Sequence, residues 1–195
     1  MKFSKVMALA GVTLLASGVL AACSGSGSSA KGEKTFSYVY ETDPDSLNYL
    51  TTGKAAVANI TSNVVDGLME NDRYGNFVPS MAEDWSVSKD GLTYTYKLRQ
   101  DAKWFTADGE EYAPIKAQDF VTGIKYAADN KSQALDLIQN SIKGLDDYVT
   151  GANTDFSNVG VKAVDDHTVQ YTLTRPEPFW NSKTTNSILF PVNEE

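Results

Sequence analysis

The sequence is poor in the two side chains that most often carry chemistry, since its 195 residues include one cysteine and one histidine. A disulfide needs two thiols, and the common zinc sites need three or four Cys or His ligands, so both are excluded. A nucleophilic Cys23 would need a basic partner. The histidine, His167, lies in an Asp-Asp-His-Thr stretch that predicts a solvent-exposed hairpin turn. We therefore expect neither a thiol enzyme nor a bound metal.

Sequence motifs of common active sites are also missing. The chain has no G-x-S-x-G, no glycine-rich phosphate loop, no C-x-x-C and no H-E-x-x-H. Paired carboxylates without calcium-loop spacing, which we interpret as solvated, occur at Asp43/Asp45, Asp146/Asp147 and Asp165/Asp166. Three tryptophans are either core aromatics, which we favour, or the lining of a ligand cleft: Trp85, Trp104 and Trp180. The sequence predicts a protein that is not an enzyme and has no cofactor.

Positive charge is scarce, with 17 Lys and Arg against 25 Asp and Glu, a net charge of −8. Removal of the first 22 residues would take away Lys2 and Lys5 and make the chain two units more negative. Such an acidic surface disfavours nucleic acid and offers no attraction to anionic lipid. Any membrane association must then come from another source.

The first 23 residues indicate how the chain could associate with a membrane. Two lysines precede an uncharged, apolar run over residues 6–22, as in a secretory signal peptide. At about 17 residues, the run is at the lower limit for spanning ~30 Å of hydrocarbon. Residues 20–23, Leu-Ala-Ala-Cys, resemble the lipobox of bacterial lipoproteins. This resemblance implies that residues 1–22 are removed and that Cys23 carries a lipid, rather than serving as a nucleophile or a buried thiol.

A Ser/Gly-rich stretch separates Cys23 from the rest of the chain. Residues 24–34, SGSGSSAKGEK, have almost nothing to bury and predict a flexible tether. We thus expect three parts: a signal peptide (1–22), a lipidated Cys with its tether (23–34), and a folded part (35–195).

The folded part combines strand and helix patterns without a regular βαβ rhythm, which predicts a mixed α/β (α+β) fold. Alternation predicts a strand over residues 35–40. Two hairpins are predicted, one over residues 85–98 around Asp90-Gly91 and one over 159–173 around a turn at 165–167. Helical spacing of apolar residues predicts helices over 57–68, over 120–127, and over 135–145 with an end at Gly144.

Several stretches follow one another in the order seen in one family of transport receptors. They are NVVDGL (63–68), YGNFVPSMAEDWSVS (74–88), DGLTYTYKLR (90–99), DAKW (101–104), AQDF (117–120), VGVKAVDDHTVQYTL (159–173) and RPEPF (175–179). Together they resemble the extracellular solute-binding proteins of peptide ABC importers, the oligopeptide-binding (OppA-like) family. The resemblance covers about residues 35–192. The signal and tether are most similar to those of streptococcal oligopeptide-binding lipoproteins.

The resemblance implies a fold and a function. Family members have two lobes that close over an extended oligopeptide, which is held mainly through its backbone, and the loaded receptor then meets the ABC permease subunits. It implies a monomer on the outer face of the cytoplasmic membrane of a Gram-positive-type cell, anchored by lipid. It also implies peptide contacts near Thr42, Asp43, Gly53 and Ala55, because these segments border the cleft in relatives. Nothing matches the acidic residue that binds the peptide ammonium in several relatives.

Family members are several hundred residues long, so we expect this chain to be the N-terminal portion of a two-lobed fold, with the second lobe missing, and to bind peptide weakly. Two alternatives remain open. One is a surface-exposed interaction or signalling remnant without transport activity. The other is a cell-surface hydrolase, for which the sequence offers no convergent nucleophile and base.

Overall fold

The computed structural model describes residues 37–39, 42–44 and 46–194. The chain divides into two units, residues 1–39 and 40–195. The predicted signal peptide, the predicted anchor Cys23 and the tether lie outside the described residues. Within the described residues, no helix is long and apolar enough to cross a membrane.

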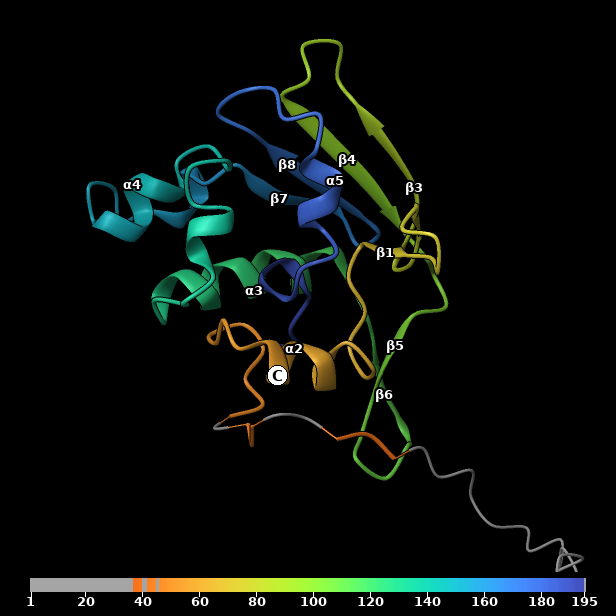
Figure 1. Cartoon of the computed structure of the whole chain (residues 1–195). Helices are drawn as coiled ribbons and strands as arrows, with labels where there is room; N and C mark the ends of the chain where they lie inside the picture. Colours follow the sequence, from red (N-terminus) through yellow and green to blue (C-terminus); the bar gives the residue numbers. More distant parts are fainter. Residues whose placement is uncertain (1–36, 40–41, 45, 195) are drawn as a thin grey trace, which may run out of the picture. The chain divides into compact units, whose positions relative to one another are not determined.

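The second unit contains short helices and antiparallel strands (Figure 1). The elements are α2 (Ala55–Thr61), β1 (Met69–Asn71), β2 (Phe77–Pro79), β3 (Ala82–Val87), β4 (Thr93–Leu98), β5 (Lys103–Phe105), β6 (Glu111–Pro114), α3 (Ala117–Asp129), η1 (Leu135–Leu137), α4 (Leu145–Thr150), η2 (Phe156–Asn158), β7 (Val161–Asp165), β8 (Thr168–Thr172), α5 (Trp180–Lys183) and η3 (Ser187–Leu189). The mixed α/β class predicted from the sequence is confirmed.

The central sheet has the order β3-β4-β8-β7, and all its neighbours are antiparallel. It joins the two predicted hairpins, since β4 of the first pairs with β8 of the second, with Tyr94 opposite Tyr171. Tyr94, Tyr96 and Leu98 are buried while the alternate side chains of β4 are more exposed, as the alternation predicted. Both hairpin predictions are confirmed. Two further hairpins, β1-β2 and β5-β6, form separate two-stranded sheets.

Helices cover one face of the central sheet. α3 packs against β7 and β8, and its buried residues include Phe120, Ile124 and Ala127, which the sequence placed on one face of a helix. α5 lies against the sheet (Figure 1). The ring of its first residue, Trp180, contacts the rings of Tyr94 and Tyr171. The core therefore lies between β4-β8-β7 and these helices.

Three predicted elements differ from the structure. The helix expected over residues 57–68 ends at Thr61, where the backbone changes to i→i−3 turns: Asn63 N donates to Ile60 O and Val64 N donates to Thr61 O. Val64 is accordingly 79% exposed. The strand expected over 35–40 is absent at the described residues 37–39. Val39 is 90% exposed, so the alternation in this segment does not bury an apolar face.

The helix expected over residues 135–145 is also wrong. The segment contains the single turn η1, and Ile142 then forms a β-bridge with Leu173. Gly144 begins α4 with a φ of 72°, whereas the sequence placed it at the end of a helix. Ile138, Ile142 and Leu145 are still fully buried, so an irregular path satisfies the same apolar spacing. His167 lies at the predicted turn but is half-buried, so the expectation of solvent exposure is only partly met.

Candidate functional site

The four residues predicted to border the ligand lie on the surface of the described chain. Thr42 and Asp43 are exposed in irregular structure, and Gly53 and Ala55 are exposed at the start of α2. The Gly53 N–H donates to Gln133 Oε1 at 3.2 Å, so this donor is already occupied. An incoming backbone carbonyl could use this N–H only by displacing the Gln133 side chain.

The loop before α2 is fixed at several points. Gln133 N donates to Thr51 O at 3.0 Å, and Asn48 Nδ2 donates to Tyr126 Oη at 2.9 Å. Leu50 is buried and Tyr49 Oη donates to the carbonyl of Pro191 at 2.6 Å. These bonds come from the end of α3 and from the C-terminal segment. Residues 48–53 are therefore held by α3, by Gln133 and by the C-terminal segment.

A cavity of about 650 Å³ lies beside this loop region, at the base of the β5-β6 hairpin. Its lining is mostly apolar and consists of Val64, Val65, Asp66, Met81, Lys103, Trp104, Phe105, Thr106, Ala107, Ile115 and Pro191. The four predicted ligand residues are not part of this lining. No local motif unites the lining residues, because they come from five separate stretches of the chain. Trp104 thus lines a cavity, the role that the sequence left open for the tryptophans.

Asp119 holds the wall of this cavity together. Its Oδ2 accepts from Trp104 Nε1 at 2.8 Å and from the backbone N of Lys116 at 3.0 Å, which caps α3. The Lys116 side chain cannot accept a hydrogen bond, so Asp119 supplies the cap. Burial raises the pKa of Asp119, and these hydrogen bonds oppose the rise. Burial, with a smaller contribution from Asp119, also raises the pKa of Tyr49 to about 12.

Tyr49→Phe is expected to change the response of stability to alkaline pH. The folded tyrosine keeps its proton at pH 11, whereas an unfolded tyrosine with the ordinary pKa of 10.0 loses it. Stability is therefore full below pH 10 and falls as the pH rises toward 12, by up to about 1.4 kcal/mol per pH unit for this group. The Phe variant should lose about 1 kcal/mol at pH 8 and show a shallower decline above pH 10. Urea unfolding at pH 8 to 11 measures both, and equal slopes for the two proteins would contradict the assignment.

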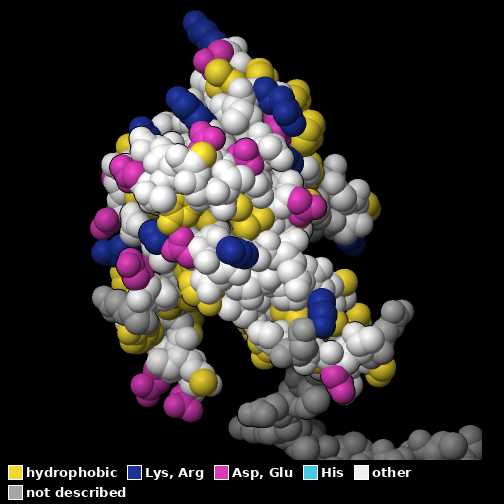
Figure 2. Space-filling model, turned by 90° about the vertical axis from the view of Figure 1, so that its left-hand side faces the viewer, with side chains coloured by type: hydrophobic (Ala, Val, Ile, Leu, Met, Phe, Trp, Pro, Cys, Tyr) yellow, Lys and Arg dark blue, Asp and Glu magenta, His cyan; other side chains and the backbone are white. Residues whose placement is uncertain are grey.

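The described residues offer no obvious place for a metal. They contain no group of three or more His, Cys, Asp or Glu side chains that could hold an ion. Basic and acidic side chains are interspersed over the face shown in Figure 2, without a broad patch of one sign.

The order of the motifs points to one family, and a comparison with family models decides the question. Residues 76–195 match the family described as "Bacterial extracellular solute-binding proteins, family 5 Middle". The chain belongs to this family. Membership confirms the resemblance found in the sequence, and the family is described as one of solute-binding proteins.

Relatives within the family are very similar over the whole chain. The oligopeptide-binding protein AliA of Streptococcus pneumoniae is 78% identical over 195 residues, which is 100% of this chain and 30% of AliA. SarA of Streptococcus gordonii, also an oligopeptide-binding protein, is 69% identical over 100% of this chain and 30% of its own length. A structure of peptide-bound OppA of Listeria monocytogenes has a TM-score of 0.69 and 31% identity, covering 76% of this chain and 28% of OppA. The chain thus spans about 30% of the length of the curated relatives it matches.

Proposed function

We propose that this chain is part of the substrate-binding component of an oligopeptide ABC importer. The observation that carries the proposal is the match of the entire chain, at 78% and 69% identity, to two proteins named as oligopeptide-binding. At sequence identities this high, the packing of the chain and the loops that contact a ligand are preserved. In this role the chain captures extended oligopeptides outside the cell and delivers them to permease subunits.

The proposed mode of capture relies on the peptide backbone. A peptide's N–H and C=O groups are the same in every sequence, so a receptor that pairs with them gains affinity without selecting side chains. Gly53 and Ala55 are exposed, and the bonds from Gln133 N to Thr51 O and from Asn48 to Tyr126 hold the chain that precedes them. The Gly53 N–H becomes available to a peptide carbonyl when the Gln133 side chain is displaced. A fixed loop loses less entropy on binding than a mobile one.

The chain alone is proposed to bind peptide weakly. Closure over a peptide needs a second surface opposite the first, and this chain matches about 30% of each of its relatives. We expect calorimetry with a mixed peptide library to show little or no heat for residues 24–195. Micromolar or tighter binding by this polypeptide would contradict the proposal that further surfaces are required.

We also propose that Cys23 anchors the protein at the outer face of the membrane. The support is the Leu-Ala-Ala-Cys sequence after an apolar run. The Cys23→Ser variant, expressed in a Gram-positive host, should lose incorporation of labelled palmitate and move from the membrane fraction to the medium. Ser24→Ala is the matched control and should behave as wild type. Membrane retention of the Cys23→Ser protein with undiminished label would show that another feature anchors it.

A further inference from the structure

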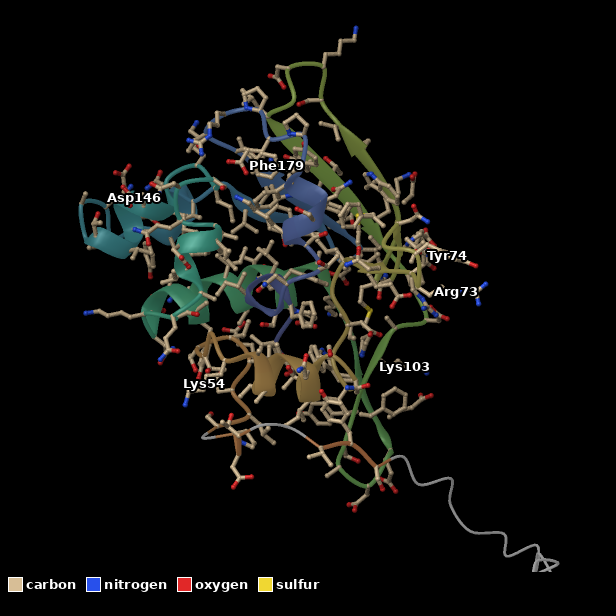
Figure 3. All side chains as sticks on the ribbon, viewed as in Figure 1. Lys54, Arg73, Tyr74, Lys103, Asp146 and Phe179 are labelled. Carbon is tan, nitrogen blue, oxygen red and sulfur yellow. The ribbon has the colours of Figure 1, made fainter. Side chains whose placement is uncertain are left out.

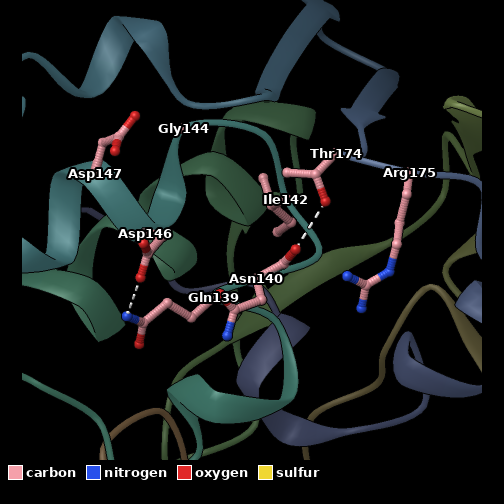
Figure 4. A pocket seen from close by; sticks show the side chains of 8 residues that line it. All are labelled: Gln139, Asn140, Ile142, Gly144, Asp146, Asp147, Thr174 and Arg175. Atoms are coloured by element: carbon pink, nitrogen blue, oxygen red, sulfur yellow. Dashed lines mark hydrogen bonds between the residues drawn. The ribbon is translucent and has the colours of Figure 1, made fainter.

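A second cavity lies between α4 and the residues that follow β8, and it shares no lining residue with the cavity beside Trp104, here called the Trp104 cavity. Its volume is about 490 Å³ and its lining consists of Gln139, Asn140, Ile142, Gly144, Asp146, Asp147, Thr174 and Arg175 (Figure 4). The predicted ligand loop is elsewhere, as the separation of Lys54 and Asp146 in Figure 3 shows. Pockets that bind small molecules commonly measure about 300 to 1,000 Å³. The cavity is large enough for an amino acid or a short peptide.

Charges of opposite sign stand on the two sides of this cavity. Figure 4 shows Asp146 and Asp147 on α4 at one side and Arg175 at the other. Asp146 Oδ1 accepts from the neutral Gln139 Nε2 at 2.7 Å, and neither aspartate forms an ion pair within the described part of the chain. Arg175 Nε lies 3.6 Å from Glu177 Oε1, and its guanidinium makes no hydrogen bond to any described residue. The aspartates therefore have no cationic partner among the described residues, while Arg175, beside Glu177, keeps guanidinium N–H donors available for a second anion.

The walls are held in position before any ligand arrives. Ile142 is fully buried and bridges to Leu173, which ties the two sides together beneath the cavity. Thr174 N donates to Ser141 O at 2.8 Å, and Thr174 Oγ1 donates to Asn140 O at 2.8 Å. Because these bonds fix the backbone of residues 140–142 and 173–174, the fold sets the positions from which the neighbouring charged side chains project. Preformed spacing favours a ligand whose own charges are separated in a fixed way.

We propose that this cavity binds a small zwitterion, a free amino acid or a short peptide, through both of its charges. The ammonium faces Asp146, with Asp147 adding negative charge on the same side, the carboxylate faces Arg175, and the amides of Gln139 and Asn140 lie between them. A simple cation is disfavoured by Arg175, and a simple anion is disfavoured by the two carboxylates. A zwitterion satisfies both sides at once. The inference does not depend on the proposed ligand loop at residues 42–55.

The test uses the ¹⁵N-labelled chain without its predicted signal peptide and follows backbone amide resonances during titration. The ligands are alanine, trialanine, N-acetyl-trialanine and trialanine amide. We expect saturable shifts at Gln139, Gly144 and Thr174 with alanine or trialanine, and an affinity at least about fivefold lower when either terminus is blocked. A response to alanine alone identifies the amino acid as the ligand, and a response to trialanine alone identifies the peptide.

Variants test the two sides separately. Arg175→Gln should weaken binding at least about fivefold and abolish the effect of blocking the carboxylate, and the double variant Asp146→Asn/Asp147→Asn should do the same for the ammonium. Arg73→Gln, at an exposed arginine on the β1-β2 turn, is the control and should bind as wild type. All four substitutions are at exposed positions, so amide spectra that match the wild type away from the cavity check the fold. Arg175→Gln also loses its contact with Glu177, and its thermal unfolding should fall slightly for that reason. The absence of saturable shifts at the cavity, or unaltered binding by Arg175→Gln, would overturn the inference. Shifts confined to Gly53 and Ala55 would overturn it while supporting the proposed peptide loop.

Discussion

Replacing Lys183 by Met is expected to lower the free energy of unfolding by about 3 to 5 kcal/mol. The reason is the buried carboxylate of Glu177, whose side chain is 1% exposed. Lys183 Nζ donates to Glu177 Oε2 at 2.9 Å and to Ser141 Oγ at 2.6 Å. Methionine keeps the length and apolar stem of lysine but leaves the buried charge without its main partner. Arg175, 3.6 Å from the other oxygen and itself exposed, compensates in part and places the effect toward the lower end of the range.

A double variant separates the loss of charge pairing from the loss of packing. In Glu177→Gln/Lys183→Met the buried charge is gone, so most of the lost stability should return. Urea unfolding of the wild type, both single variants and the double variant gives the coupling free energy. A loss below about 1 kcal/mol for Lys183→Met would contradict the reliance of Glu177 on Lys183. Equal losses in the single and double variants would assign the effect to packing instead.

Trp180→Ala is expected to be comparably destabilising, at about 3 to 5 kcal/mol. Trp180 is fully buried, and its ring centroid lies 5.5 Å from that of Tyr171 and 6.1 Å from that of Tyr94. It is the largest side chain that α5 places against the central sheet, and its removal leaves a cavity between the sheet and α5. Thermal and urea unfolding followed by circular dichroism measure the loss.

The neighbouring residue Phe179 provides the control for this prediction. Its side chain is 58% exposed, so Phe179→Ala should cost less than about 1 kcal/mol in the same short segment. Trp180→Phe should fall between the two, since it retains part of the apolar contact. If Phe179→Ala and Trp180→Ala were equally destabilising, α5 would not pack as described.

The parts of the fold that could be predicted from the sequence are those in which local and long-range signals agree. Asp90-Gly91 requires a turn, and the alternation on either side places Tyr94 and Tyr96 on one face. The structure contains both the turn and the shared face: Gly91 has a φ of 71°, and Tyr94 and Tyr96 are buried. In α3, likewise, two signals agree: Phe120 and Ile124 recur at helical spacing, and Asp119 caps the beginning of the helix.

Prediction failed where apolar spacing was the only signal. Leu135, Ile138 and Ile142 recur as they would on a helix, but a bridge to Leu173 and a turn at Gly144 bring the same side chains into the core. Apolar spacing indicates which side chains are buried. It does not determine the backbone conformation, because more than one path of the chain can bury the same side chains. No pattern within 135–145 indicates the bridge, because its partner lies about thirty residues further along the chain.

Cavities are harder to predict than helices and strands, because their lining residues come from distant parts of the chain. The Trp104 cavity combines residues near 65, 105 and 191, and the Asp146 cavity combines 139–147 with 174–175. The sequence predicts that Asp146 and Asp147 are solvated, and both are exposed in the structure. Only the fold shows that Arg175 stands opposite the pair. The predicted ligand residues from Thr42 to Ala55 came from the family resemblance, and their contact with peptide stays a prediction.

The most direct measurement of the proposed function is calorimetry on a chimera in which this chain replaces the 195 matching residues of AliA. We predict micromolar or tighter binding of oligopeptides by the chimera, within about tenfold of AliA itself, since the two chains are 78% identical over this region. A folded chimera that binds no oligopeptide, beside an AliA control that does, would contradict the claim that this chain forms part of a peptide receptor.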